Sequence, residues 1–406
     1  MANVSSSNGL EKRPKLRFPG FDEPWNESKL SACFAKNIKK NTDGRISNVI
    51  CNSAKMGLIP QRDYFDKDIA NSDNTSGYYI IEHNDFVYNP RKSSDAPYGP
   101  ISRYAYPDAG IVSPLYLCFR AKGDVDTNFF EWYFRSSAWH RYIYMTGDSG
   151  ARHDRVSIKD DDFFSMPICF PSSVEQKKIA SFLNTIERRI SSQQLLVDNL
   201  KKYKRGLLHE VLCEKIKITK SPWNVCKIGD YLSSKNIKQL PTPEAPLMAF
   251  TATGGVCDKG ERYDRGFLVK DASTKLYKRT DLNDFIYSSN NLDVGSIGLN
   301  LYGSAVISDV YEIFSISGAD PWFISEAIRQ KPVLHQILKY RQGCLYGQYR
   351  IYAEDFLEVS IRVPSLETQK QIGIIFSRID YRIKSEQALL KSLENAQKFF
   401  LQQLFI

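Results

Sequence analysis

The sequence of 406 residues lacks several features that would assign a protein to a class at once. No apolar run approaches the roughly 20 residues that cross a bilayer. The opening stretch MANVSSSNGLEKRPKLRF has no apolar segment of the kind that signal peptides carry, so we expect a cytoplasmic protein. The eight cysteines form no CxxC pair, which argues against a zinc ribbon and against a disulfide framework.

Familiar catalytic motifs are also missing. There is no GxxxxGK phosphate loop, no GxGxxG and no HExxH, and the five histidines are isolated. The stretch YNPR at 88–91 lacks the second proline and the aromatic residue of the amino-methyltransferase motif that it partly matches. The carboxylates of DRVSIKDDDFF at 154–164 are interpreted as solvated rather than metal-binding. We therefore predict a chain without catalytic residues, cofactor or metal.

What the sequence does contain is an internal repeat. The stretch SVEQKKIASFLNTIERRI begins at Ser173, and LETQKQIGIIFSRIDYRI begins at Leu366, 193 positions later. Both follow a Pro-Ser pair. Ser172 with Glu175 predicts a capping box in the first copy, and Ser365 with Thr368 predicts a weaker cap in the second.

Each repeat predicts a helix of about 40 residues, or about 60 Å at 1.5 Å per residue. Apolar residues recur with alternating steps of four and three, which is typical of a coiled-coil seam. We predict that the two helices pair with each other; the alternative is that each lies on its own globular domain. The helix-pairing residues are Ile179, Leu183, Ile186, Ile190, Val197 and Leu200 in the first copy, and Ile372, Phe376, Ile379, Ile383, Leu390 and Leu393 in the second. Polar residues interrupt both seams at equivalent places, namely Gln193 and Lys204, and Glu386 and Gln397.

The segments before the helices repeat more loosely. NDFVY at 84–88 matches NDFIY at 283–287, and PWNESKL at 24–30 matches PWNVCKI at 222–228. These fragments are rich in the residues that strands favour. The predicted fold is α+β with an internal repeat, in which two globular domains alternate with two long helices that pair with each other. The predicted boundaries are a tail at 1–15, domains at 16–171 and 216–364, and helices at 172–215 and 365–406.

Between the shared strands the two copies diverge. Two copies of one scaffold with different inserts indicate one task performed on two different targets. A formal net charge of +9 is compatible with nucleic acid as that target. Arginine and lysine favour guanine edges, asparagine and glutamine favour adenine, and phosphates accept from any donor. The candidate contacts for such a target are Arg91, Lys92, Tyr98, Ser102, Arg103, Tyr104, Ser149, Arg152 and Arg155 in the first domain, and Ser288, Asn290, Asn291, Asn300, Tyr302, Tyr346, Gln348 and Arg350 in the second.

With these pieces in view, the sequence resembles the DNA-specificity subunit of type I restriction-modification enzymes. The resemblance rests on LRFPGFDEPWNESKL at 16–30, on the DFVYN and GIVSPLY strands, and on Pro171-x4-QKKIA with its second copy after Pro364. It departs from the family pattern at Thr368 and Gly373, where glutamate and alanine are usual.

The resemblance implies two target-recognition domains that each read one half of a split, asymmetric DNA sequence, so the candidate contacts named above would be DNA-binding residues. It implies that the two long helices pack as an antiparallel coiled coil and give the molecule a pseudo-twofold repeat. It implies no catalysis in this chain, and assembly with two modification (methyltransferase) subunits and with restriction (translocase-nuclease) subunits. S-adenosylmethionine and ATP would be bound by those partners. A 60 Å helix limits the half-site separation to at most about 17 base pairs at 3.4 Å each. The rival readings are an assembly scaffold that does not recognise a DNA sequence, and an enzyme with an unrecognised site.

Overall fold

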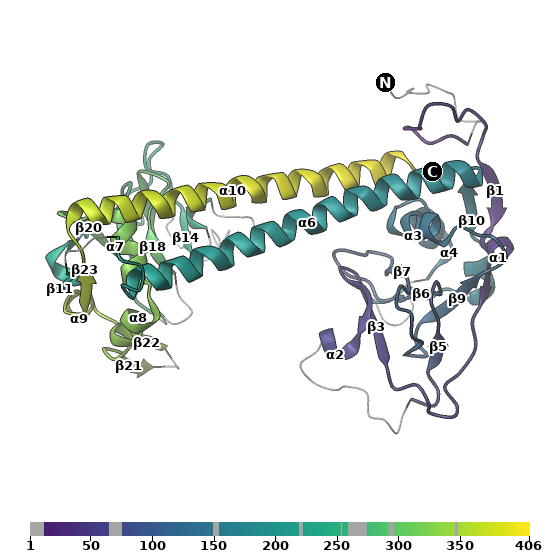
Figure 1. Cartoon of the computed structure of the whole chain (residues 1–406), viewed down its shortest axis with the longest axis horizontal. Helices are drawn as coiled ribbons and strands as arrows, with labels where there is room; N and C mark the ends of the chain where they lie inside the picture. The colour runs from purple at the N-terminus through teal and green to yellow at the C-terminus, as the bar shows by residue number, and fades with distance from the viewer. Residues whose placement is uncertain are drawn as a thin grey trace. The chain divides into compact units, whose positions relative to one another are not determined.

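The computed structural model describes residues 12–64, 75–148, 154–218, 222–252, 254–258, 274–290, 292, 296–345 and 348–406. The chain forms two compact units, and each combines one globular domain with half of each long helix (Figure 1). Unit 1 comprises 1–194 and 388–406, and unit 2 comprises 195–387. Within the described ranges, no helix has the length and apolar character that crossing a bilayer requires.

The globular part of unit 1 consists of short strands and helices. Two four-stranded sheets have the orders β2-β9-β6-β7 and β4-β3-β8-β5, and β1 pairs antiparallel with β10. The elements in chain order are β1 (Asn26–Lys29), α1 (Leu30–Cys33), β2 (Phe34–Lys36), β3 (Val49–Ser53), β4 (Gly57–Pro60), α2 (Gln61–Tyr64), β5 (Tyr79–Ile81), β6 (Phe86–Tyr88), β7 (Ile101–Arg103), β8 (Gly110–Val112), β9 (Leu117–Ala121), α3 (Thr127–Arg135), α4 (His140–Thr146), α5 (Asp160–Phe164) and β10 (Pro167–Phe170).

The globular part of unit 2 repeats this plan. The sheet β12-β20-β17-β18 corresponds to β2-β9-β6-β7, and the pair β11-β23 corresponds to β1-β10. The elements are β11 (Asn224–Lys227), the 3-10 helix η2 (Ile228–Asp230), β12 (Leu232–Ser234), β13 (Lys238–Gln239), β14 (Ala249–Thr251), β15 (Gly255–Cys257), β16 (Tyr277–Thr280), β17 (Phe285–Ser288), β18 (Ile297–Leu299), β19 (Ala305–Ile307), β20 (Tyr311–Ile316), α7 (Pro321–Ile328), α8 (Lys331–Leu338), β21 (Gln342–Leu345), β22 (Gln348–Arg350), α9 (Ala353–Leu357) and β23 (Ser360–Val363).

One turn is built in the same way in both domains. It precedes β6 and β17, and its asparagine adopts a left-handed backbone, with φ 71° at Asn84 and 67° at Asn283. The next residue is a buried aspartate that accepts the backbone N–H three residues earlier, at 2.8 Å for Asp85 and 2.7 Å for Asp284. The cation that neutralises the aspartate differs. Arg120 from β9 pairs with Asp85, whereas Lys235, which follows β12, pairs with Asp284.

The two predicted long helices are α6 (Ser173–Leu212) and α10 (Leu366–Gln403), and they pack against each other (Figure 1). In unit 1 the early part of α6 meets the late part of α10, where the rings of Phe182 and Phe400 lie 4.9 Å apart. In unit 2 the late part of α6 meets the early part of α10, where Lys204 Nζ lies 2.9 Å from Asp380 Oδ2. The helices therefore run antiparallel.

The burial of the predicted seam agrees with this pairing. Seven of the helix-pairing residues are buried: Ile179, Leu183, Val197, Ile372, Phe376, Ile383 and Leu390. The other members are half-buried: Ile186, Ile190, Leu200, Ile379 and Leu393. The polar seam residues also take part, since Lys204 bonds Asp380 and Gln397 donates to Glu187. Gln397 lies 193 positions after Lys204, and Asp380 lies 193 positions after Glu187. The two contacts are therefore equivalent in the repeat.

Both long helices start with the same hydrogen bond. The Gln176 Nε2 donates to the carbonyl of Pro171 at 2.8 Å, and Gln369 Nε2 donates to the carbonyl of Pro364 at 2.9 Å. Both glutamines are buried. This contact explains why a proline and a glutamine recur at this spacing, since the buried glutamine satisfies the carbonyl of the proline two residues before the helix.

The residue before that glutamine differs between the copies. Both carboxylate oxygens of Glu175 accept hydrogen bonds from Arg17 at 2.8 Å, so the capping box predicted with Ser172 gives way to an ion pair. Thr368 stands in the second copy, and its hydroxyl lies 3.1 Å from Ser365 Oγ. The N–H of Thr368 also donates to Ser365 Oγ, at a long 3.5 Å, so the predicted Ser365 cap is present in the second copy.

Candidate nucleic-acid interface

The domain of unit 1 carries a groove of about 600 Å³ where the β3–β4 turn faces the loop after β6. The ionisable side chains of Lys, Arg and Asp that line it are Lys55, Arg91, Lys92, Asp95 and Arg155. The one carboxylate lies 3.7 Å from Lys55 Nζ. The groove is therefore positive, as contact with a phosphate backbone or with guanine edges requires.

A short backbone bridge holds two arginines opposite each other in this groove. The N–H of Lys92 donates to Asp154 O at 2.8 Å, and the N–H of Val156 donates to Pro90 O at 2.9 Å. Arg91 and Arg155 are the residues paired by this bridge. The side chain of Arg91 is 67% exposed, and its Nε lies 3.7 Å from Asp154 Oδ2, beyond hydrogen-bond distance.

Arg155 is less exposed, and its Nε is buried. Among the residues that the structure describes, this nitrogen has no hydrogen-bond partner. Of the two arginines, it is therefore the exposed Arg91 that has N–H donors available to a ligand in the groove.

Three further residues of this groove were not predicted from the sequence: Asn52, Lys55 and Tyr116. Asn52 is buried and donates to Val87 O at 2.8 Å, which ties the β3–β4 hairpin to the end of β6. Burial raises the pKa of Tyr116, so its hydroxyl stays protonated and can donate a hydrogen bond. No local sequence pattern marks these residues, because they join the groove only through the pairing of distant strands.

Three predicted DNA contacts of the first domain have side chains that bind or pack against other residues of the same domain. Ser102 Oγ donates to Asn52 Oδ1 at 2.7 Å. Arg103 donates through Nε to Glu131 at 2.7 Å and through Nη1 to Asn84 at 2.7 Å. The ring of Tyr98 packs 4.9 Å from His140. These residues shape the loop, and the groove is lined by Arg91, Lys92 and Arg155 instead.

Tyr104 and Asn300 need a correction, because both are fully buried. They occupy equivalent places beside the repeated turn, since their N–H groups donate to Asp85 O and Asp284 O respectively. Tyr104 donates its hydroxyl to Asp108 O, and the Asn300 amide donates to Gly303 O at 2.7 Å. Neither side chain reaches the surface, so we remove both from the candidate DNA contacts.

The domain of unit 2 has a bridge at the equivalent place. The N–H of Ile351 donates to Ser289 O at 3.0 Å, and Asn290 pairs with Arg350. The hydroxyl of Ser288 donates to Asn290 O at 2.9 Å and steadies the loop. Asn290 thus occupies the position that Arg91 has in the first domain.

The guanidinium of Arg350 is ion-paired within its own domain. Its Nη2 lies 3.0 Å from Glu312 Oε1, and its guanidinium lies 5.1 Å from the ring centre of Tyr352. Glu312 also pairs with Lys278 at 2.9 Å. The strand register places Glu312 opposite Tyr287, and the equivalent residue opposite Tyr88 is Leu117. The second bridge is therefore less positive than the first.

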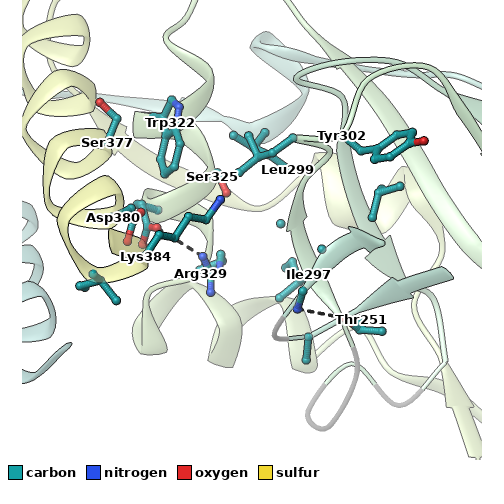
Figure 2. Close-up of a pocket in the computed structure, with 18 of the residues that line it drawn as sticks. Thr251, Ile297, Leu299, Tyr302, Trp322, Ser325, Arg329, Ser377, Asp380 and Lys384 are labelled. Atoms are coloured by element: carbon teal, nitrogen blue, oxygen red, sulfur yellow. Dashed lines mark hydrogen bonds and ion pairs between the residues drawn. The ribbon is translucent and has the colours of Figure 1, made fainter. Parts of the chain in front are cut away.

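Tyr302 lies elsewhere in unit 2, in a cleft of about 640 Å³. Figure 2 shows Thr251, Ile297, Leu299 and Tyr302 on one side and Trp322, Ser377, Asp380 and Lys384 on the other. Lys204, Arg329 and Lys384 line the cleft with Glu326 and Asp380, so it carries less positive charge than the groove of unit 1. Tyr302 is half exposed.

Four predicted contacts lie outside the described residues: Ser149, Arg152, Asn291 and Tyr346. Gln348 begins strand β22. Within the described ranges, no three histidine, cysteine, aspartate or glutamate side chains gather as a metal ion would require.

Comparison with known proteins shows which proteins have a similar sequence or fold. Residues 269–395 match the family model of the type I restriction modification DNA specificity domain. The S subunit of a type I restriction-modification system from M. genitalium is 15% identical, with a TM-score of 0.58 over 97% of this chain and 99% of that one. A chain from a structure on complex assembly and conformational transition of the type I R-M system is 14% identical, with a TM-score of 0.56 over 95% and 98%. No curated protein matches.

Residues 269–395 therefore carry a type I restriction modification DNA specificity domain, and the chain as a whole has the fold of the type I S subunits. The role of this family is DNA sequence specificity, and its members are non-catalytic. They work with DNA and with the other subunits of a restriction-modification system.

Proposed function

We propose that this chain reads a split, asymmetric DNA target, with one half-site for each globular domain. The recognition domains are residues 16–171 and 216–364, and the spacer helices are 172–215 and 365–406. One observation carries the proposal: the same strand, turn and backbone bridge occur in both domains, but they present Arg91 in one and Asn290 in the other. Different side chains on one scaffold favour two different half-sites.

The energetics of base recognition favour two recognition domains in one chain. Each good bidentate contact contributes roughly 1–3 kcal/mol of discrimination against a wrong base. Two domains joined in one chain act on one DNA molecule, so the second domain binds at a high effective concentration. A homodimer would read a palindrome, whereas two different domains read two different blocks.

The proposal extends to the assembly. The chain binds double-stranded DNA together with two modification (methyltransferase) subunits, and with restriction (translocase-nuclease) subunits when DNA is cut. S-adenosylmethionine and ATP are bound by those partners and not by this chain. The complex works in the cytoplasm, where the DNA lies.

The test is to purify the chain with its modification subunit, expose DNA to the complex and sequence the methylated sites. We expect a motif of two short, different blocks around a fixed gap. Replacing residues 16–171 with another recognition domain should change one block and leave the other intact.

Two results would contradict the proposal. A palindromic motif would mean that the two domains do not read DNA independently. A complex that forms but neither methylates nor binds DNA in a sequence-dependent way would favour the alternative of an assembly scaffold.

A further inference from the structure

The loop after the central strand has the same backbone in both recognition domains. Strands β6 and β17 share the sequence pattern Phe-aliphatic-Tyr, and in both the tyrosine is fully buried. Tyr88 stacks on Phe163 with ring centres 5.2 Å apart, and Tyr287 stacks on Phe356 at 4.5 Å. These anchors fix where each strand ends. Three residues beyond the tyrosine stand Arg91 and Asn290.

The bridge that follows each strand is made by backbone atoms. The carbonyl of Pro90 accepts from Val156 N, and the carbonyl of Ser289 accepts from Ile351 N, at 2.9 and 3.0 Å. The residue that each bridge pairs with position 91 or 290 is an arginine in both domains. Because the backbone alone closes the bridge, the side chain at position 91 or 290 is left to contact a ligand.

The surroundings of these two positions differ in charge. Arg91 lies in the groove with Lys55, Lys92 and Arg155. These cations outnumber the one lining carboxylate, Asp95, and Asp154 Oδ2 lies 3.7 Å from Arg91 Nε. Asn290 lies beside Arg350, which shares the carboxylate of Glu312 with Lys278. A guanidinium in a positive groove matches the two acceptors of a guanine edge, whereas an amide matches the donor and acceptor of an adenine edge.

Resting on the proposed function, we infer that Arg91 and Asn290 are equivalent base-reading positions that select a guanine in the first half-site and an adenine in the second. Arg155 and Arg350, across the two bridges, orient the reading side chains or contact phosphate. The two blocks of the target differ at this position because the two side chains differ.

The test uses the complete complex with its modification subunit and a DNA library, with methylated sites read by sequencing. Arg91→Gln replaces guanine readout with an amide, and Asn290→Arg does the reverse. We expect Arg91→Gln to lower the preference for guanine at one position of one block by about ten- to hundred-fold, the discrimination that one bidentate contact gives. Asn290→Arg should shift one position of the other block from adenine towards guanine.

Each variant is a control for the other, since each should leave the second block unchanged. Arg45→Gln removes the same charge from the same domain, at a side chain that is 85% exposed and does not line the groove, and it should leave the motif as it is. Arg91→Lys keeps the charge but loses the planar fork, and it should weaken the guanine preference without weakening methylation at other sequences.

Other outcomes would overturn the inference without touching the proposed function. If the wild-type complex yields two blocks and neither Arg91→Gln nor Asn290→Arg alters them, these positions do not read bases. If Arg91→Gln slows methylation at every site with the motif unchanged, Arg91 contacts phosphate. If the wild-type complex yields no split motif, the proposed function itself fails.

Discussion

The two units solve the same structural problems with different side chains. At the equivalent polar positions of the helix seam, unit 2 has an ion pair between Lys204 and Asp380. Unit 1 has a hydrogen bond between Gln397 and Glu187 instead. The difference shows that the repeat preserves the position of a contact and not its chemistry. Different side chains therefore stabilise each unit, and substitutions at equivalent positions should change stability by unequal amounts.

The largest difference is expected at the start of α6. Arg17 is 11% exposed and Glu175 is 1% exposed, and removing one partner of a buried ion pair typically costs about 3–5 kcal/mol. We expect Arg17→Ala to lower the free energy of unfolding by about 3 kcal/mol, measured by urea titration of tryptophan fluorescence.

A double variant tests the cause of that loss. Arg17→Ala with Glu175→Thr copies the arrangement at Thr368 and removes the unpaired carboxylate. It should recover most of the lost stability. A loss below about 1 kcal/mol for Arg17→Ala alone would show that the pair contributes no more than an exposed salt bridge.

The next effect concerns two glycines on the long helices. A Cβ on Gly373 would lie 2.3 Å from Asp320 Oδ1, whereas a Cβ on Gly206 would meet no atom within 4 Å. Gly373→Ala should therefore destabilise the protein by about 1–3 kcal/mol through overpacking. Gly206→Ala is the matched control and should stabilise it by about 0.5–1 kcal/mol through helix propensity. Thermal unfolding midpoints that move in the same direction for both variants would refute this contrast.

A smaller effect is expected at the paired glutamines. Gln176→Ala leaves the carbonyl of Pro171 without its bond and should cost about 1 kcal/mol. Gln369 also accepts the N–H of Asp320 at 3.1 Å, so Gln369→Ala removes two bonds and should cost about twice as much. Chemical denaturation of both variants checks this ratio, and equal losses would show that the second bond adds nothing.

The smallest effect is electrostatic and depends on the proposed function. Glu312→Gln frees Arg350 from its carboxylate partner and makes the second bridge resemble the first. If Arg350 then contacts one more phosphate, the slope of log binding constant against log salt should steepen by about one. Fluorescence anisotropy of the complex on labelled target DNA at several salt concentrations gives this slope. An unchanged slope would mean that Arg350 faces no phosphate.

Much of the fold could be predicted because the long helices and several strands occur twice in the sequence, so each copy supports the prediction made from the other. The seam positions of both helices and their mutual pairing follow from an apolar period that is kept over a length no ordinary globular domain needs, whereas their antiparallel direction was implied by the family resemblance. The candidate interface was harder to predict. Tyr104 and Asn300 fall in divergent loops, yet both are buried beside a turn that the two domains share. Lys55 joins the groove from a hairpin more than 30 residues earlier in the chain, and long-range hydrogen bonds such as that of Asn52 to Val87 O hold the hairpin there.

The backbone bridge after β6 and β17 also bears on how such a protein changes over generations. Because main-chain atoms close the bridge, a single codon change at position 91 or 290 need not disturb the turn, the core or the helices. Under the proposed function, the preferred DNA site could then drift one base at a time while the fold remains intact. The modification and restriction subunits that rely on this chain to find their DNA site would be redirected by the same mutation. DNA methylation and DNA cleavage would therefore change their target together.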